Sequence, residues 1–197
     1  MTLYILFAVL LGSVAAGIFE SRKHQANLKK ISVRIHVNGT RGKSSVTRLI
    51  AAGLNAGGIK TFAKTTGTVP RVITPDGEEF AVYRPSGANI IEQLRIVNFA
   101  AKNGAESLVI ECMALNPAYQ ALCELKLVRS TIGVITNARA DHLDVMGPDE
   151  ISVAKALLGT TPVNGTLFTC EEDYVELFKS AGKDRGTNVE IIGREIS

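Results

Sequence analysis

The stretch SVRIHVNGTRGKSSVTRLIAAGL, residues 32–54, decides the fold of this chain. A short β-branched run, Ser32–Val37, leads into the glycine-rich segment Gly39–Ser44. Apolar residues then recur at helical spacing until the pair Gly57–Gly58 ends the helix. A strand, a glycine-rich turn and a helix form the arrangement in which backbone N–H groups and a helix N-terminus surround phosphate oxygens. The sequence therefore predicts an anion-binding loop at the end of a strand.

Strands and helices alternate along the rest of the chain. Further strands are expected at Ile59–Ala63, Glu79–Tyr83, Ser107–Glu111, Thr131–Thr136, Thr166–Thr169 and Asn188–Ile192. Helices are expected at Asn89–Lys102, Pro117–Glu124, Pro148–Leu158 and Glu171–Ala181. Strands separated by helices imply right-handed βαβ units, with active residues at the carboxyl ends of the strands. The predicted fold class is α/β, a P-loop-type and mostly parallel sheet flanked by helices.

The N-terminus predicts a membrane anchor. Thr2–Phe19 is an uncharged, apolar run of 18 residues, close to the ~20 that a helix needs to cross a bilayer. No Lys or Arg precedes the run and the basic segment ESRKHQANLKK, residues 20–30, follows it, which argues against a cleaved signal peptide. The same charges predict an N-terminus outside the cell and a cytoplasmic C-terminal side. A signal peptide and a buried N-terminal helix are the alternatives. We expect residues 1–30 to be an anchor with a basic flank that meets anionic lipids, and residues 31–197 to be one domain.

Charge and cysteine content exclude other classes of protein. The whole chain carries a net +3, yet residues 20–48 alone carry +7, so the remainder is acidic. A basic surface spread over the domain is therefore not expected, and neither is a nucleic-acid partner. Cys112, Cys123 and Cys170 lack the spacing of a zinc site and are expected to be reduced core thiols on the cytosolic side of the membrane. His24 and His36 are expected to be a flank residue and a strand residue.

The glycine-rich loop carries the residue types that bind a nucleotide phosphate. Glycine is needed where the backbone approaches the anion with positive φ. Lys43 would reach the β and γ phosphates, and the Ser44 hydroxyl would occupy one position on Mg²⁺. The full GxxxxGK[ST] pattern is absent, because Val37 stands where it requires its first glycine.

Acidic and imidazole side chains follow two other predicted strands. The apolar run Leu108–Ile110 ends in Glu111, a carboxylate placed where a cation bridging phosphates would lie. The strand Thr131–Thr136 ends in TNARADHLD, which brings Asn137, Asp141, His142 and Asp144 to the same edge of the sheet. A histidine between two aspartates beyond a strand is plausible as a metal ligand.

GTRGKSS, ECMALNP and TNARADHLD together resemble the Mur ligase family of ATP-dependent amide ligases, which includes the peptidoglycan ligases and folylpolyglutamate synthetase. The phosphate loop of that family is a shortened G-T-x-G-K-[ST], like residues 39–44 here. Within the family, the apolar start and the segments AKTTGT and DHLDVMGP are similar to the members that form poly-gamma-glutamate. The resemblance implies the central ATPase domain of the family, from which the family continues into a C-terminal domain; residues 31–197 are then expected to be incomplete or complemented by a second chain.

The resemblance also implies a set of site residues. The candidate nucleotide-binding residues are Asn38, Gly39, Thr40, Arg41, Gly42, Lys43, Ser44, Ser45 and Asn137. The candidate catalytic residues are Lys43, Glu111 and His142, and the candidate magnesium ligands are Ser44, Glu111, His142 and a carbamylated Lys155. A solvent-facing helix lysine is an equally good interpretation of Lys155. Lys64–Thr68 and Arg84–Gln93 match family segments and are expected to line the site, with no role assigned.

The implied activity is amide-bond formation with ATP and Mg²⁺. ATP would phosphorylate a glutamate γ-carboxyl, and a glutamate amine would displace phosphate, with glutamate and poly-gamma-glutamate as substrate and product. A single apolar helix cannot conduct a polyanion across a bilayer, so other membrane subunits of a synthase and export complex are expected. A membrane-tethered nucleotide-binding regulator or kinase, and a catalytically silent scaffold of a polymer exporter, are the alternatives.

Overall fold

A computed structural model describes residues 1–67, 69–85 and 87–193. The strands are β1 Val33–Asn38, β2 Thr61–Thr65, β3 Arg71–Ile73, β4 Glu79–Ala81, β5 Ser107–Glu111, β6 Ile132–Ile135, β7 Thr166–Thr169 and β8 Asn188–Ile191. The helices are α1 Thr2–Lys30, α2 Lys43–Ala56, α3 Glu92–Lys102, α4 Pro117–Leu122, α5 Leu143–Met146, α6 Glu150–Leu157 and α7 Val175–Arg185. A π-helix, η1 Cys123–Val128, continues α4, and a 3₁₀ turn, η2 Leu158–Thr160, continues α6.

The strand before the glycine-rich loop lies inside one sheet whose order is β4-β3-β2-β5-β1-β6-β7-β8. Strands β2, β5, β1, β6, β7 and β8 are parallel to their neighbours in that order. Val37 pairs with Glu111 and Asn38 with Ile135, so the loop after β1 and the segments after β5 and β6 emerge at one edge. The α/β class and the mostly parallel sheet are confirmed.

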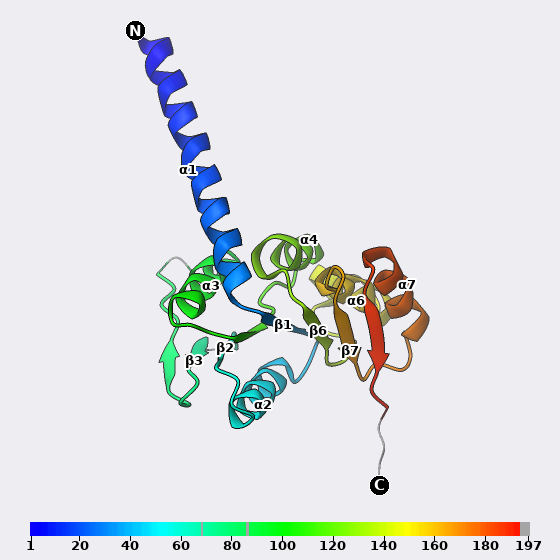
Figure 1. The fold of residues 1–197 in the computed structure, drawn as a ribbon. Helices are drawn as coiled ribbons and strands as arrows, with labels where there is room; N and C mark the ends of the chain where they lie inside the picture. Colours follow the sequence, from blue (N-terminus) through cyan, green and yellow to red (C-terminus); the bar gives the residue numbers. More distant parts are fainter. Residues whose placement is uncertain (68, 86, 194–197) are drawn as a thin grey trace.

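Helices cover both faces of the sheet. Figure 1 shows α2 on one face and α3, α4, α6 and α7 on the other. Alternation along β5 explains this, because Val109 packs in the cluster on the α2 side whereas Leu108 and Ile110 pack in the cluster with α3. Hydrophobic core therefore lies on both faces of the sheet, and the carboxyl edge of the strands is left for polar groups.

Two edge strands depart from the parallel pattern. The expected strand Glu79–Tyr83 is the shorter β4, and it pairs antiparallel with β3, which was not predicted. A turn at Thr74–Gly77 explains the hairpin, since Gly77 has φ +86 and its N–H donates to Thr74 O at 3.0 Å. The hairpin extends the sheet beyond β2, to which β3 is also antiparallel.

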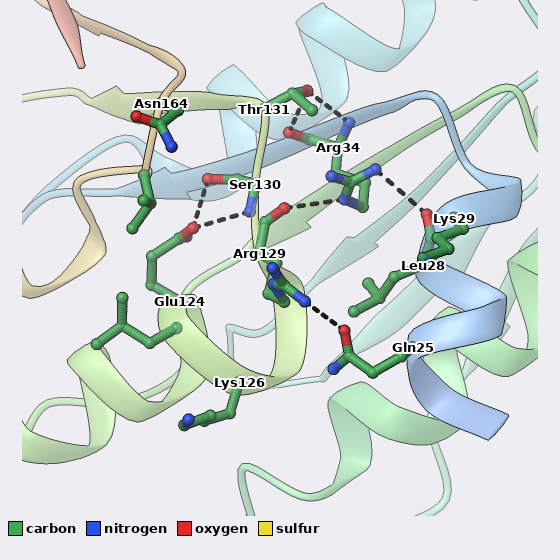
Figure 2. A pocket seen from close by; sticks show the side chains of 12 residues that line it. Gln25, Leu28, Lys29, Arg34, Glu124, Lys126, Arg129, Ser130, Thr131 and Asn164 are labelled. Carbon is green, nitrogen blue, oxygen red and sulfur yellow. Dashed lines mark hydrogen bonds between the residues drawn. The ribbon is translucent and has the colours of Figure 1, made fainter. Parts of the chain in front are cut away.

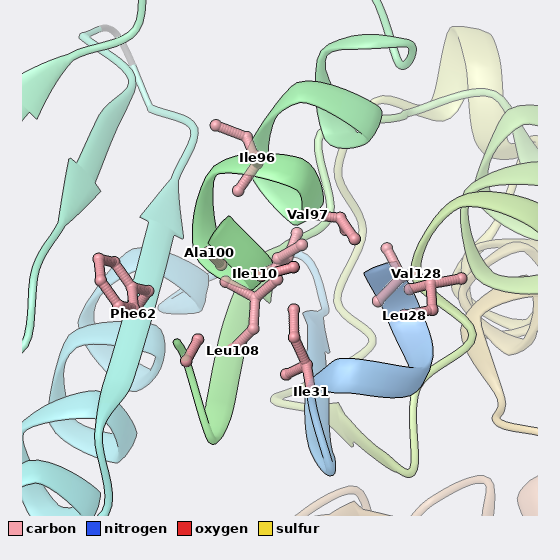
Figure 3. Packing of buried hydrophobic residues seen from close by; sticks show 11 residues of the cluster. Leu28, Ile31, Phe62, Ile96, Val97, Ala100, Leu108, Ile110 and Val128 are labelled. Carbon is pink, nitrogen blue, oxygen red and sulfur yellow. The ribbon is translucent and has the colours of Figure 1, made fainter. Parts of the chain in front are cut away.

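Helix α1 is a single helix of 29 residues with two different parts. Its apolar part is unburied and is the one segment of the described chain that is long and apolar enough to be a candidate membrane span. The end of α1 instead packs on the domain, and Figure 3 shows Leu28 beside Val128 and, below it, Ile31 near Ile110. His24 lies in the segment that follows the apolar part and is buried against the domain, with Nε2 2.9 Å from Leu127 O, and its assignment to a membrane flank stays a prediction.

Several helix boundaries differ from the expectation. Helix α3 begins at Glu92 rather than Asn89, whose side chain accepts from Ile91 N in a turn. Helix α7 begins at Val175, because the carboxylate of Glu171 accepts from Ala138 N and Asp173 N instead. The helix expected to end at Glu124 continues as η1, and α5 was not predicted.

All three cysteines are free. Cys112 and Cys123 are buried, as predicted for reduced core thiols. The prediction is wrong for Cys170, which is exposed. This residue follows the last residue of β7 and therefore lies beyond the end of the buried strand. His36 lies within β1 and is fully buried, as predicted for a strand residue.

Candidate active site

The glycine-rich loop between β1 and α2 has the backbone that its sequence predicts. Gly39 has φ +130 and Gly42, which begins the helix, has φ +81. A Cβ on Gly39 would lie 2.1 Å from Thr136 Oγ1, whereas a Cβ on Gly42 would meet nothing within 4 Å. Glycine at position 39 is therefore required by both conformation and packing, and at position 42 by conformation alone.

Asn137 holds this loop in place from the end of β6. Its Oδ1 accepts from Thr40 Oγ1 at 2.5 Å and from Arg41 N at 3.1 Å, and its Nδ2 donates to Arg41 O at 3.0 Å. Its backbone oxygen accepts from Thr40 N at 3.1 Å. Thr136, which sequence reasoning missed, adds a bond from Oγ1 to Arg41 O at 2.7 Å. The amide of Asn137 thus positions the loop, and its assignment as a nucleotide-binding residue stays a prediction.

Lys43 and the serines lie in the first turn of α2. Lys43 Nζ donates to Gly39 O at 2.6 Å and to Thr40 O at 3.3 Å, so the ammonium group lies over the loop. Ser45 is exposed beside it. A lysine held over backbone amides at a helix N-terminus is suited to an anion, since the local field is positive.

Ser44 and Glu111 are brought together across two elements. Ser44 Oγ donates to Glu111 Oε2 at 2.8 Å, and the same oxygen accepts from Thr66 N at 2.8 Å. Glu111 is only 3% exposed, at the carboxyl end of β5. A hydroxyl and a carboxylate in contact are the oxygen ligands that a hard divalent cation prefers. These two predicted magnesium ligands therefore fit such an ion.

Asn38 faces away from the loop. Its Nδ2 donates to Gln120 Oε1 at 2.7 Å and to Thr160 Oγ1 at 3.1 Å, within the layer of α4 and η2. The side chain is 2% exposed. Its amide supports the end of β1 from the protein interior, whereas its prediction as a nucleotide contact remains untested.

The segment after β6 connects to the loop through a different pair. Asp141 Oδ2 lies 3.3 Å from Arg41 Nη2. His142, half exposed and with φ +49, has Nε2 3.9 Å from Asp141 Oδ1, and within the described residues it forms no ion pair with Glu111. Asp144 is exposed on α5 and Lys155 is exposed on α6. The described residues contain no group of three or more His, Cys, Asp or Glu side chains placed to hold a metal.

A buried charge cluster, not predicted from the sequence, lies next to Glu111. Glu92 accepts from Lys64 Nζ at 2.6 Å and from Arg84 Nε at 2.6 Å, and Arg84 also reaches Thr66 Oγ1 at 3.4 Å. Burial lowers the pKa of Lys64 against the opposing effect of Glu92. The pKa of Glu92 is lowered because its two cations outweigh its burial. The cluster joins the segments 64–68 and 84–93, of which residues 68 and 86 lie outside the described residues.

A polar cavity of about 530 Å³ adjoins the loop. Thr136 and Asn137 form the side next to the loop, and Glu171 and Asp173 form the far side. This volume falls in the range of small-molecule sites. The loop and the cavity together provide a place for phosphates and an adjoining polar space.

Comparison with known proteins agrees with this geometry. The Mur ligase middle domain matches residues 37–196, which is most of the chain. The chain belongs to the Mur ligase family. The middle domain begins at the end of β1 and includes the loop, Glu111 and the segment after β6.

Two curated relatives are similar in sequence. The capsule biosynthesis protein CapB of Bacillus anthracis is 45% identical over 175 residues, which cover 88% of this chain and 38% of that protein. The PGA synthase CapB of Bacillus subtilis (strain 168) is 44% identical over 176 residues, covering 88% of this chain and 44% of that one. The chain thus spans less than half the length of these relatives.

A solved structure shares the fold at low identity. The bifunctional folylpolyglutamate synthase/dihydrofolate synthase of Yersinia pestis, complexed with AMPPNP and a Mn ion, aligns with a TM-score of 0.68 and 16% identity. The alignment covers 89% of this chain and 46% of that one. Because the identity is this low, the likeness supports the fold alone.

Proposed function

We propose that this chain is the membrane-anchored, nucleotide-binding part of an ATP-dependent amide ligase that makes poly-gamma-glutamate. The observation that carries the proposal is the contact of Ser44 with Glu111 beside a loop whose glycines have positive φ. Family membership and 44–45% identity to two CapB proteins support the substrate class. Glutamate and poly-gamma-glutamate are the proposed substrate and product.

The loop residues would hold the ATP phosphates. Backbone N–H groups at the start of α2, from Gly42 to Ser45, would bind a phosphate, because those of Thr40 and Arg41 already donate to Asn137. Lys43 would exchange its two carbonyl partners for phosphate oxygens. The neighbouring cavity next to Asn137 has room for the nucleoside. Asn137 would act on the phosphates indirectly, by fixing Thr40 and Arg41.

Ser44 and Glu111 would hold Mg²⁺, which supplies charge neutralisation at the phosphates when bound. Their oxygens already touch, so little rearrangement of this pair is needed. His142 is the proposed third ligand, and its half-exposed position at the start of α5 leaves the side chain able to turn. A carbamylated Lys155 remains part of this proposal, and α6 presents that lysine to solvent.

The chemistry needs an activated acid, because hydroxide is a poor leaving group from a carboxylate. Phosphorylation of a glutamate γ-carboxyl gives an acyl phosphate, and attack by the glutamate amine releases phosphate and forms the amide. Lys43 and the loop amides would stabilise the charge that develops on the transferred phosphoryl group. The buried Lys64–Glu92–Arg84 cluster would keep Thr66 and Glu111 in register beside it.

The proposed location follows from the apolar part of α1. We propose a single-pass anchor at Thr2–Phe19 with its N-terminus outside and the α/β domain in the cytoplasm, because the basic residues follow the span. Residues 31–197 would be the catalytic domain. Other membrane subunits would carry the polymer across the bilayer.

Hydroxylamine trapping tests this function. Membranes containing the chain together with the products of its neighbouring genes are incubated with Mg·ATP, with and without glutamate. A ligase should release phosphate only when glutamate is present, and hydroxylamine should convert the acyl phosphate into a glutamyl hydroxamate. Formation of the hydroxamate would support the proposal.

Two other results would contradict it. A stable phosphoprotein without glutamate-dependent phosphate release would indicate a kinase or regulator. Saturable ATP binding with no turnover in the presence of the partner proteins would indicate a silent scaffold of an exporter.

A further inference from the structure

A second cavity lies at the opposite edge of the sheet from the phosphate loop. Its volume is about 640 Å³. The end of α1 forms one wall, η1 forms another, and the segments that precede β6 and β7 close the remainder. Figure 2 shows Gln25 of α1 and Arg129 after η1 pointing toward each other, with Ser130 and Glu124 bonded to one another on the other side of Arg129. None of the candidate nucleotide-binding residues lines this cavity.

Four cationic residues line the cavity, namely Lys29, Arg34, Lys126 and Arg129. Arg34 is fixed, because its Nε donates to Arg129 O at 2.9 Å and its Nη1 to Ile31 O at 2.6 Å. Arg129 Nη1 bonds to Gln25 Oε1. The pKa of Arg34 is lowered, first by burial and then by the charge of Arg129. Arg34 thus lies beside the backbone of Arg129, and an anion in the cavity would offset the positive charge of the two residues.

The one acid in the cavity wall is already compensated. Glu124 Oε2 lies 2.8 Å from His36 Nδ1, and its Oε1 accepts from Ser130 N at 2.8 Å and Ser130 Oγ at 2.9 Å. Burial would lower the pKa of His36, but interactions with Cys112 and Glu124 outweigh it and raise the pKa to about 9. His36 therefore balances Glu124 at neutral pH, and the cavity keeps its positive charge.

The position of the cavity identifies the source of the anion. Gln25 lies six residues beyond Phe19, the last residue of the apolar run, which is about 9 Å along a helix. Headgroups occupy roughly 5–7 Å outside each side of the hydrocarbon core. The average tilt of about 20° brings one side of a helix closer to the bilayer. With Thr2–Phe19 as the proposed membrane span, the mouth of the cavity would lie next to the lipid headgroups.

We propose that this basic cavity binds the phosphate group of an anionic membrane lipid from the cytoplasmic leaflet. The proposal depends on the proposed membrane anchor and is independent of the ligase chemistry. The bound lipid would fix how the domain is oriented under the membrane, because its phosphate would contact both α1 and η1.

Native mass spectrometry of the full chain in mixed micelles of phosphatidylglycerol and phosphatidylcholine tests the proposal. We expect one phosphatidylglycerol to be retained per chain in preference to phosphatidylcholine. Lys126→Gln with Arg129→Asn removes two charges, and asparagine tolerates the φ of +47 at position 129. This double variant should weaken retention by about 30-fold.

The matched control removes the same charge outside the cavity. Arg22→Gln with Lys23→Gln changes two exposed residues of α1 that do not line it, and this variant should keep the preference. If the double variant fails to fold, the single variants Lys29→Gln and Lys30→Gln replace it as test and control. Both residues are exposed, but only Lys29 lines the cavity. Equal losses in the cavity and control variants, or no loss in either, would overturn the proposal.

Two further arms separate the sources of anion and the role of the anchor. Displacement of the lipid by millimolar inorganic phosphate or by a short poly-gamma-glutamate would overturn a lipid source. Release of the wild-type chain from carbonate-washed membranes would overturn the anchor and the lipid site together. A chain that stays in the membrane but retains no anionic lipid would overturn the cavity proposal alone.

Discussion

The two edges of the parallel sheet attract anions in different ways. At the carboxyl edge, glycines with positive φ expose backbone N–H groups, and Lys43 is the one cation within the loop that contacts its carbonyls. At the amino edge, four cationic side chains line the cavity, and the carbonyl oxygens of Leu28 in α1 and of Ile31 just after it hold Arg34. The carboxyl edge is built for a ligand that must be positioned within fractions of an ångström, whereas the amino edge is suited to a less exactly placed charge.

The comparison also shows why the two edges tolerate change differently. A backbone site depends on φ and on close packing, so one added methyl group disturbs it. A side-chain site depends on the number of charges, so each charge that is removed lowers its affinity by a similar factor. The predictions below test this contrast, and the largest effect comes first.

Lys43→Ala should lower ATP turnover by about 10³-fold, because the charge that neutralises the transferred phosphoryl group is lost. The melting temperature should change little, since Lys43 bonds only to the loop carbonyls Gly39 O and Thr40 O. Phosphate release and calorimetry on the same preparation measure both quantities. Lipid retention at the amino edge should be unaffected. Turnover within threefold of wild type would remove Lys43 from the mechanism.

Gly39→Ala should lower the free energy of unfolding by about 2–3 kcal/mol and abolish nucleotide binding. Its Cβ would lie 2.1 Å from Thr136 Oγ1 at a φ of +130. Gly42→Ala is the matched control, because its φ is +81 but the space around it is open, and it should cost about 1 kcal/mol. Denaturant unfolding measures the difference. Equal costs would show that packing against Thr136 does not constrain the loop.

Asn137→Ala should weaken nucleotide affinity by about tenfold, because Thr40 and Arg41 lose their amide partner while the bond from Thr40 N to the Asn137 backbone remains. Asn188→Ala, an exposed amide on β8, is the control and should bind normally. Fluorescent nucleotide titration provides the measurement. A loss of a thousandfold or more would instead indicate that Asn137 contacts the nucleotide directly.

The smallest effect concerns pH. The pKa of His36 is raised to about 9 in the folded protein from its ordinary value of 6.5. Its stabilising contribution is therefore complete below pH 6.5 and is lost as the pH rises through 9. The melting temperature should fall by a few degrees across that window. A double variant, His36→Met with Glu124→Gln, removes the pair and should lose this slope. An identical slope in both proteins would contradict the ion pair.

Local sequence was sufficient for much of the fold and part of the site. The period of the apolar residues predicted the strand, loop and helix around Gly39, as well as β5 with Glu111 at its end, because these depend on near neighbours. The hairpin of β3 and β4 was missed. The late start of α7 was also missed, because a hydrogen bond from Ala138 N to Glu171 outweighs helix propensity at that position. The exposure of Cys170 likewise depends on where β7 ends in the sheet.

The sequence by itself determined that this chain has an apolar N-terminal segment, an α/β domain and a glycine-rich loop between a strand and a helix, because periodicity, glycine and charge are local properties. Only the tertiary structure decided which residues meet. The Ser44–Glu111 contact, the Asn137 clamp and the basic cavity beneath α1 each join segments separated by 67 to about 100 residues. Their pairing depends on strand order and on which face each helix covers, and these arise from packing of the whole domain.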